Sequence, residues 1–391
     1  MSNVAHRMQR IAPFYVMDLL AQARQLEAQG RSIIHMEIGE SDFDTPAPII
    51  EAGQAALASG ETHYTPAKGI PALREAISGF YRHYYQTDLD PSRVIVTPGA
   101  TGALQLAMSV LINPGESVLM ADPGYPCNRH FVELVEGQPV ALPVGPETGY
   151  QLTAELVEAA WREDTKAVLV ASPSNPTGTL IADDEMQRLY TTVQRLGGVL
   201  IVDEIYQGLV YDQVGGTALR YADNLFVINS FSKFFGMTGW RLGWLVAPDS
   251  FVDPIDRLAQ NIFLSAPTLS QYAALSAFTP DVMEILEQHR QAFQQRRDFL
   301  LPALRELGFS IPVTPQGAFY LYAGCGELSD DSQAFAGRLL QEGGVAVTPG
   351  LDFGFNHPES HLRFAYTTDL DRLKEGVERI KGFLSSGNNN I

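Results

Sequence analysis

The sequence predicts an α/β protein built around a mostly parallel sheet with helices on both faces. Short runs of β-branched and other apolar residues recur through the middle of the chain, and stretches with helical periodicity lie between most of them. Strands of a parallel sheet are buried on both faces and appear as nearly continuous apolar runs, so this alternation indicates a parallel sheet. The expected strands are residues 93–99, 117–123, 166–173, 198–204, 225–230 and 241–248, and the clearest helices between them are 101–112 and 183–196.

The two ends of the chain are expected to form a second unit. Residues 14–30 are predicted to be a helix that ends at Gly30, because glycine is favoured just after a helix. A long amphipathic helix is expected from about residue 281, followed by short strands and two further helical stretches, which is typical of an α+β unit. We expect the N-terminal helix to pack against this unit. Because 391 residues exceed the usual single core, we predict a large domain of residues 46–284 and a small domain of residues 1–45 and 285–391.

Charge and cysteine usage exclude several classes of function. The formal net charge of −18 disfavours binding to nucleic acid or to an anionic membrane surface, because both would repel the chain. No apolar run is long enough to cross a bilayer, and the N-terminus lacks the features of a secretory signal peptide. Cys127 and Cys325 have no CxxC spacing, so neither a disulfide framework nor a metal site is expected. We expect a cytoplasmic protein.

One lysine follows an expected strand at the edge where open α/β sheets bind ligands. The chain has only five lysines, and Lys233 comes soon after the run 225–230, beside Ser230 and Ser232 and not far from Arg241. A lysine in such surroundings is suited to a lowered pKa and to acting as a Schiff-base amine. Taken alone, a lysine is more often an ordinary surface residue.

Two further strand ends carry polar groups that suit a pyridine cofactor. Asp203 follows the apolar residues of the run 198–204, and Tyr206 comes three residues later. A carboxylate there can keep a pyridine nitrogen protonated, as pyridoxal phosphate (PLP) requires, although capping of a following helix is the simpler role. Asn175 lies in the rigid turn SPSNPTG, and its amide can hydrogen-bond the phenolic oxygen of PLP, although a plain turn asparagine is equally common.

Two more of the expected strand ends offer an anion site and an aromatic ring. The segment ProGlyAlaThrGly at 98–102 opens a helix whose first N–H groups can bind a phosphate. GxGxxG and GxxxxGK[ST] patterns are absent from the chain, which excludes dinucleotide and P-loop sites. Tyr125 can stack on a planar ring, or it can simply cover apolar surface. Five expected strand ends thus each supply a group that PLP requires. Such a joint occurrence is poorly explained by chance, so the sequence predicts that the chain binds PLP.

The chain resembles the class I/II aminotransferases of PLP fold type I, the aspartate aminotransferase-like enzymes. The resemblance covers nearly the whole sequence and is most specific in SFSKFFGMTGWRLGW, where an arginine follows the lysine by eight residues. It implies a seven-stranded, mostly parallel sheet in a large domain and a smaller α+β domain. The other matching segments are IGESDFDTP (38–46), THYTPAKGIPALREAI (62–77), SPSNPTG (172–178), VDEIY (202–206) and LRFAYT (362–367).

The resemblance also implies a role for each candidate residue of the cofactor site. Lys233 would form the Schiff base with PLP and move a proton between the substrate Cα and the cofactor C4′. Asp203 would pair with the pyridinium nitrogen, and Tyr206 and Asn175 would hydrogen-bond the cofactor O3′, so that Lys233, Asp203 and Tyr206 form the catalytic set. The phosphate and the ring would be held by Ser230, Arg241, the backbone of Ala100 and Thr101, and Tyr125.

Substrate binding and assembly are implied in the same way. Arg363 would bind the α-carboxylate of the amino acid or 2-oxo acid, with Gly39 and Asn175 beside it. Tyr64 would reach the cofactor phosphate of a neighbouring subunit, which implies a homodimer. The implied reaction is a ping-pong transfer of an amino group from an L-amino acid to a 2-oxo acid. A carbon–sulfur lyase, a cyclopropane-carboxylate synthase-like enzyme or a non-catalytic PLP-binding protein are the alternatives.

Overall fold

The larger sheet of the protein has seven strands in the order β2-β8-β7-β6-β5-β3-β4. The structure is a computed structural model that describes residues 4–387. Neighbouring strands pair in parallel except at β8, which is antiparallel to both β2 and β7. The predicted α/β class and the seven-stranded, mostly parallel sheet are therefore confirmed. The strands are β2 (Val94–Thr97), β3 (Ser117–Asp122), β4 (Gln138–Pro143), β5 (Thr165–Ala171), β6 (Val199–Asp203), β7 (Phe226–Ser230) and β8 (Gly243–Val246).

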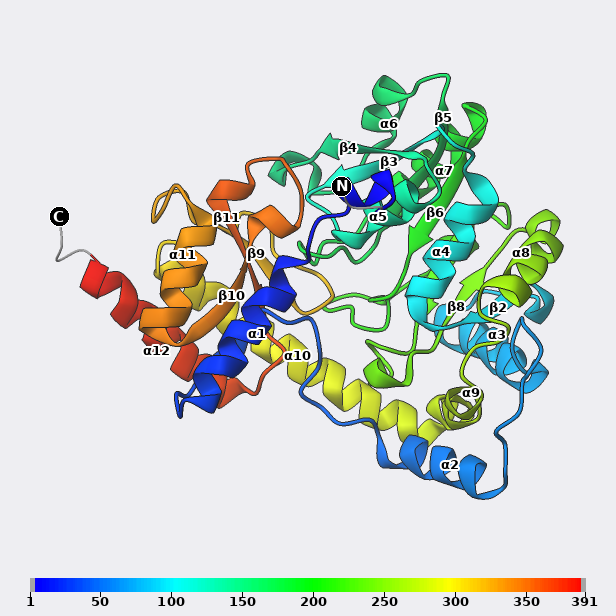
Figure 1. Ribbon diagram of the computed structural model, residues 1–391, viewed down its shortest axis with the longest axis horizontal. Helices are drawn as coiled ribbons and strands as arrows, with labels where there is room; N and C mark the ends of the chain where they lie inside the picture. Colours follow the sequence, from blue (N-terminus) through cyan, green and yellow to red (C-terminus); the bar gives the residue numbers. More distant parts are fainter. Residues whose placement is uncertain (1–3, 388–391) are drawn as a thin grey trace.

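Helices cover both faces of this sheet (Figure 1). In β2, Val94 and Val96 pack on one face together with Leu73 of α3, whereas Ile95 packs on the opposite face with Leu104 of α4. Every second residue therefore faces the same layer, as the pleat of a strand requires. The helices around the sheet are α2 (Ala47–Ala58), α3 (Pro71–Tyr85), α4 (Gly99–Leu111), α5 (Cys127–Leu134), α6 (Ala154–Ala160), α7 (Asp183–Arg195), α8 (Asp249–Ile262) and α9 (Thr268–Ala274).

A second sheet of four strands, in the order β1-β10-β11-β9, is built from both ends of the chain. Its strands are β1 (Ile34–Met36), β9 (Tyr320–Gly324), β10 (Val345–Pro349) and β11 (His361–Ala365), and its helices are α1 (Tyr15–Ala28), α11 (Ser332–Arg338) and α12 (Leu370–Gly387). Leu19, Ala23 and Leu26 of α1 form one apolar cluster with Ala346 of β10. The N-terminal helix therefore packs against the C-terminal part of the chain, as predicted (Figure 1).

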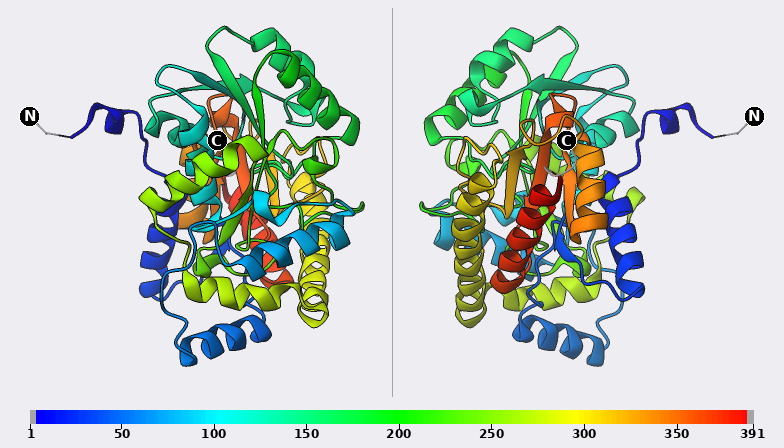
Figure 2. Two further views of the ribbon diagram at one scale, coloured as in Figure 1. Left: turned by 90° about the vertical axis from the view of Figure 1, so that its right-hand side faces the viewer. Right: turned by 90° about the vertical axis from the view of Figure 1, so that its left-hand side faces the viewer.

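The long predicted helix is confirmed as α10 (Pro280–Glu306). It runs from the region of α2 and α9 toward the four-stranded sheet, as Figures 1 and 2 show. The predicted boundary near residue 285 lies inside this continuous helix. The domain limits of 46–284 and 1–45 with 285–391 stay a prediction.

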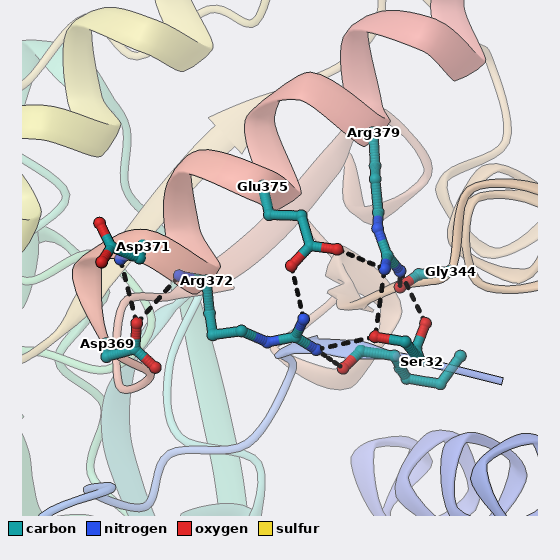
Figure 3. Close-up of polar contacts among 8 residues, drawn as sticks. Ser32, Gly344, Asp369, Asp371, Arg372, Glu375 and Arg379 are labelled. Atoms are coloured by element: carbon teal, nitrogen blue, oxygen red, sulfur yellow. Dashed lines mark hydrogen bonds and ion pairs between the residues drawn. The ribbon is translucent and has the colours of Figure 1, made fainter. Parts of the chain in front are cut away.

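Polar side chains on α12 hold the chain where it enters the four-stranded sheet (Figure 3). Arg372 donates to the backbone oxygen of Ile33 at 2.7 Å, and Arg379 donates to the backbone oxygens of Ser32 at 2.6 Å and Gly344 at 3.2 Å. Both arginines also pair with Glu375. These contacts fix the start of β1, and the segment that follows β1 reaches the candidate site.

Among residues 4–387, no helix combines the length and the apolar character that crossing a bilayer would require. Nor does this part of the chain bring three or more His, Cys, Asp or Glu side chains together in a way that could hold a metal ion.

Candidate active site

One cavity lies where the carboxyl ends of the parallel strands meet residues of the four-stranded sheet. The side chains from β2, β5, β6 and β7 converge because these strands run in the same direction, so that their ends share one edge of the sheet. All the site residues predicted from the sequence line this cavity except Tyr64. The predicted residues that line it are Gly39, Ala100, Thr101, Tyr125, Asn175, Asp203, Tyr206, Ser230, Lys233, Arg241 and Arg363.

Lys233 extends into the cavity from the loop that follows β7. Its Nζ donates to the backbone oxygen of Gly39 at 2.6 Å and lies 5.9 Å from the centre of the Tyr206 ring. Burial lowers the pKa of Lys233 to about 8, because desolvation disfavours the ammonium ion. The carboxylate of Glu40 opposes this shift, and the positive charge of Arg363 adds to it. A substantial fraction of the amine is therefore neutral near physiological pH.

Asp203 is the last residue of β6, and its side chain is buried where it lines the cavity. One carboxylate oxygen accepts from the backbone N–H of Ile205 at 3.0 Å. Burial raises the pKa of Asp203 to about 6, although this hydrogen bond and the nearby charge of Lys233 oppose the shift. Asp203 is thus mostly ionised at neutral pH and suited to pairing with a cation in the cavity.

Arg363 enters the cavity from β11 and is 3% exposed. Its Nη1 donates to Asn175 Oδ1 at 3.0 Å, and its Nη2 donates to the backbone oxygen of Glu37. The guanidinium carbon lies 4.3 Å from the centre of the Tyr320 ring, and Nε has no hydrogen-bond partner among the residues that the structure describes. Asn175 Oδ1 and the backbone oxygen of Glu37 are both neutral, so the buried positive charge of Arg363 remains available to an anionic ligand.

The start of α4 forms a cradle for an anion. Ser230 Oγ and Ser232 Oγ lie 3.0 Å apart beside it, and Arg241 supplies a guanidinium. A Cβ at Gly243 would lie 2.7 Å from the backbone nitrogen of Ala100, so glycine is required for β8 to approach the helix start this closely. Free N–H groups at a helix start, two hydroxyls and a guanidinium together suit a phosphate.

Tyr125 follows β3 and the cis peptide bond between Asp122 and Pro123. Its ring meets that of Phe14 edge to face, with centroids 6.4 Å apart. Burial raises the pKa of Tyr125 well above its usual range, so the phenol stays protonated. Both rings line the cavity.

Tyr320 of β9 is a residue that sequence reasoning missed. Its hydroxyl lies 2.8 Å from that of Tyr206, and its ring packs so closely on Gly39 that a Cβ there would lie 1.9 Å from the Tyr320 hydroxyl. Glycine at position 39 is therefore a packing requirement. Tyr320 belongs to a strand of the smaller sheet, so the pattern of polar groups after strands of the main sheet does not include it.

Tyr64 does not reach the cavity of its own chain. It is 82% exposed and lines a separate surface hollow with Lys68 and Arg74. Its predicted role in a neighbouring subunit stays a prediction.

Comparisons with known proteins give the family. The model of the family described as "Aminotransferase class I and II" matches residues 31–380. The (5-formylfuran-3-yl)methyl phosphate transaminase of Methanocaldococcus jannaschii is 39% identical over 98% of this chain and 100% of its own length. The valine–pyruvate aminotransferase of Mycobacterium tuberculosis is 36% identical over 96% of this chain and 97% of its own.

Solved structures agree with the sequence comparisons. An aminotransferase from Mycobacterium tuberculosis superposes with a TM-score of 0.95 at 36% identity, covering 99% of this chain and 100% of that one. The aspartate aminotransferase of Thermus thermophilus with maleate gives a TM-score of 0.92 at 33% identity, covering 98% and 100%. The resemblance stated from the sequence motifs is confirmed: the chain belongs to the class I and II aminotransferases, a PLP-dependent family, and is an aminotransferase.

Proposed function

We propose that the chain binds PLP in this cavity and transfers the amino group of an L-amino acid to a 2-oxo acid by a ping-pong mechanism. The observation that carries the proposal is the convergence on one cavity of an amine with a lowered pKa, a buried carboxylate and an anion cradle at a helix start. These are the three groups that a phosphorylated pyridine aldehyde requires of a protein.

The residues of the cavity fit PLP. The cradle at the start of α4, with Ser230 and Arg241, would hold the phosphate, and Asp203 would keep the ring nitrogen protonated. Asn175 and Tyr206 would hydrogen-bond the phenolic oxygen, and the buried Tyr125 would stack on the ring. When bound, PLP supplies the electron sink that stabilises negative charge at the substrate Cα.

The residues around the substrate would bind, orient and deprotonate it. Arg363 would hold the α-carboxylate, because within residues 4–387 its buried guanidinium donates hydrogen bonds only to neutral oxygens. Lys233 Nζ would attach the cofactor until the amine of the substrate takes its place. The freed Lys233 amine would then take the proton from the substrate Cα, and a pKa of about 8 suits a base at physiological pH. The side chains of Val16 and Met17 would cover the substrate from α1 and exclude water.

The apolar wall of the cavity supports a neutral amino donor. Phe14, Val16, Met17 and Ile38 line it on the side of the four-stranded sheet. The name of the valine–pyruvate aminotransferase relative is in keeping with such a donor.

The active form would be a cytoplasmic homodimer in which Tyr64 of the partner subunit completes each site.

Replacement of Lys233 by alanine tests the proposal directly. We expect Lys233→Ala to fold normally, to lose amino-group transfer and to lose the covalent cofactor that borohydride traps on the wild-type chain. Lys166→Ala is the matched control, because Lys166 is near the start of β5, at the opposite end of the strand from the site. Transfer at the wild-type rate by Lys233→Ala, or trapping of the cofactor on another lysine, would refute the assignment.

A panel of amino acids separates this reaction from the other PLP reactions. Addition of a true donor to the holoenzyme should convert the cofactor to pyridoxamine phosphate in a single half-reaction. Release of pyruvate and ammonia would indicate a lyase, and no conversion with any amino acid would indicate a binding protein.

A further inference from the structure

Residues 38–45, which we call the strap, connect β1 to α2 and pass over Lys233. No residue of the strap belongs to a helix or a strand. The backbone oxygen of Gly39, within the strap, accepts the hydrogen bond from Lys233 Nζ at 2.6 Å. The strap lacks the repeating backbone hydrogen bonds of a helix or a sheet. Its position therefore depends more on contacts with the side chains around it.

One of these contacts is an ion pair between Asp42 of the strap and Arg296 of α10. Arg296 Nη1 donates to Asp42 Oδ1 at 2.7 Å and Nη2 donates to Asp42 Oδ2 at 2.9 Å. Arg296 Nη1 and the backbone N–H of Asp42 both donate to the backbone oxygen of Thr367, at 3.0 and 3.2 Å. The Arg296 side chain is 7% exposed and that of Asp42 is 31% exposed. The fork of two parallel hydrogen bonds fixes direction as well as distance.

The next residue of the strap is bound by the same helix. The ring of Phe43 stacks on His289 with centroids 4.0 Å apart and planes inclined by 3°, and the guanidinium carbon of Arg296 lies 4.8 Å from the ring centre. Phe293 meets Phe43 edge to face at 5.5 Å. Phe43 is thus bound by three side chains of α10.

The two ends of the strap are tied to different parts of the site. Thr367 donates to the backbone oxygen of Ile38 at 3.2 Å. Thr45 donates to the backbone oxygen of Gly236 at 2.6 Å and accepts from Trp240 Nε1 at 3.1 Å. Gly236 and Trp240 belong to the loop after Lys233, so the strap connects α10 to the loop that carries the lysine.

We infer that the Asp42–Arg296 ion pair is a positioning device that keeps the Gly39 carbonyl on the amine of Lys233 and covers that amine. Asp42 and Arg296 are positioning residues, since they act on Lys233 only through the strap. Partly buried ion pairs add little net stability because desolvation offsets their attraction, and their main effect here is geometric. The catalytic meaning of the inference rests on the proposed role of Lys233.

The test measures how fast Lys233 reacts with acetic anhydride in full-length, cofactor-free protein, with the modified lysine identified by peptide mass spectrometry. Asp42→Asn removes the ion pair with little change in size. We expect it to raise the modification rate of Lys233 on the order of tenfold, the factor that corresponds to 1.4 kcal/mol. The rate of Lys166, on a distant strand end, should not change.

The matched control is Asp212→Asn. Asp212 pairs with Arg297, the neighbour of Arg296 on α10, at 2.7 Å, and it lies outside the strap. Arg296→Lys is the second variant, because it keeps the positive charge but cannot form two parallel hydrogen bonds with Asp42. It should also raise the rate at which Lys233 is modified. It replaces Asp42→Asn if that variant does not fold. In the holoenzyme, hydrogen exchange at residues 38–45 should accelerate in both variants and not in Asp212→Asn.

An unchanged Lys233 rate in a folded variant whose strap exchanges faster would overturn the inference, as would an equal rise in Asp212→Asn. The modification rate does not depend on turnover. If Lys233→Ala retained activity, the proposed function would fail while the labelling experiment still decided whether the ion pair positions the strap.

Discussion

Lys233 is subject to opposing influences from its neighbours. Burial lowers the pKa of its amine most strongly, and Glu40 raises it because a nearby negative charge favours the ammonium form. Glu40 is exposed, so solvent screens its charge and its influence is limited. The balance leaves the pKa at about 8, where the amine can both accept and release a proton near physiological pH.

Glu40→Gln should lower the pKa of Lys233 below about 8, because it removes the charge that stabilises the ammonium ion. In cofactor-free protein, acetylation of Lys233 followed against pH should then reach its half-maximal rate at a lower pH. The rate at pH 7 should rise by less than about fivefold, since the glutamate is exposed. Glu51→Gln, on α2, is the control. An unchanged or higher midpoint in Glu40→Gln would contradict the assigned influence.

Arg363→Lys should raise KM for every amino donor. A lysine keeps the charge but loses the planar pair of donors that matches a carboxylate. A charge-assisted hydrogen bond contributes about 1.5–3 kcal/mol, so kcat/KM should fall by about 10- to 150-fold. Steady-state kinetics with small and large donors checks this. A loss confined to one donor would place Arg363 at the side chain of the substrate instead of at its α-carboxylate.

Single residues were predictable from the sequence where they follow a strand of the main sheet. Lys233, Asp203 and Asn175 were found in this way, and the structure brings them to one cavity. Tyr320 was not found, because it lies within β9 and reaches the cavity only through the packing of two sheets. Such a contact between remote strands has no local pattern in the sequence.

At the scale of elements, α1 contributes part of the wall of the cavity, and a carboxylate from a distant part of the chain binds the start of this helix. Asp352 accepts from the backbone N–H groups of Tyr15 at 3.0 Å and Val16 at 3.1 Å, at the start of the helix. It thereby caps the end of α1 from which Val16 and Met17 line the cavity.

Asp352→Ala should therefore change both stability and substrate selection. Loss of the cap should cost about 1–2 kcal/mol of unfolding free energy. The loosened helix start should raise KM more for donors with large side chains than for alanine. Asp331→Ala is the matched control: Asp331 caps α11 by accepting from Gln333 at 3.0 Å and Ala334 at 2.9 Å. It should lower stability comparably and leave KM unchanged. Equal kinetic effects in the two variants would refute a specific role of Asp352.

The elements that the sequence did not predict have identifiable causes. β4 (Gln138–Pro143) was not among the expected strands, because it is an edge strand with a proline near its start and one at its end, and none of its residues is buried. Prolines are tolerated at a sheet edge, where no neighbour needs their N–H. The antiparallel direction of β8 was also not predicted, since its apolar run has the same composition whichever way the strand points.

At the scale of the whole molecule, the site depends on two sheets that are linked by α10 and the strap. The seven-stranded sheet supplies Lys233 and Asp203, whereas the four-stranded sheet supplies Arg363. The two sets come from distant parts of the sequence, so the site forms only when both sheets are in place. Tyr64 is the one predicted site residue that does not line the cavity of its own chain, and it is 82% exposed.

Mixed dimers test whether Tyr64 acts across a subunit interface. For the proposed homodimer, Lys233→Ala in both subunits should abolish activity, and Tyr64→Ala in both should weaken it, because each site would lose the proposed contact to the phosphate. A mixed dimer holds one site with an intact Lys233 and with Tyr64 of the partner subunit, so it should recover about half of the wild-type activity. The measurement is activity per mixed dimer, isolated with two affinity tags. If Tyr64 acted within its own chain, the mixed dimer would contain no intact site, and its activity would stay at half that of the Tyr64→Ala homodimer.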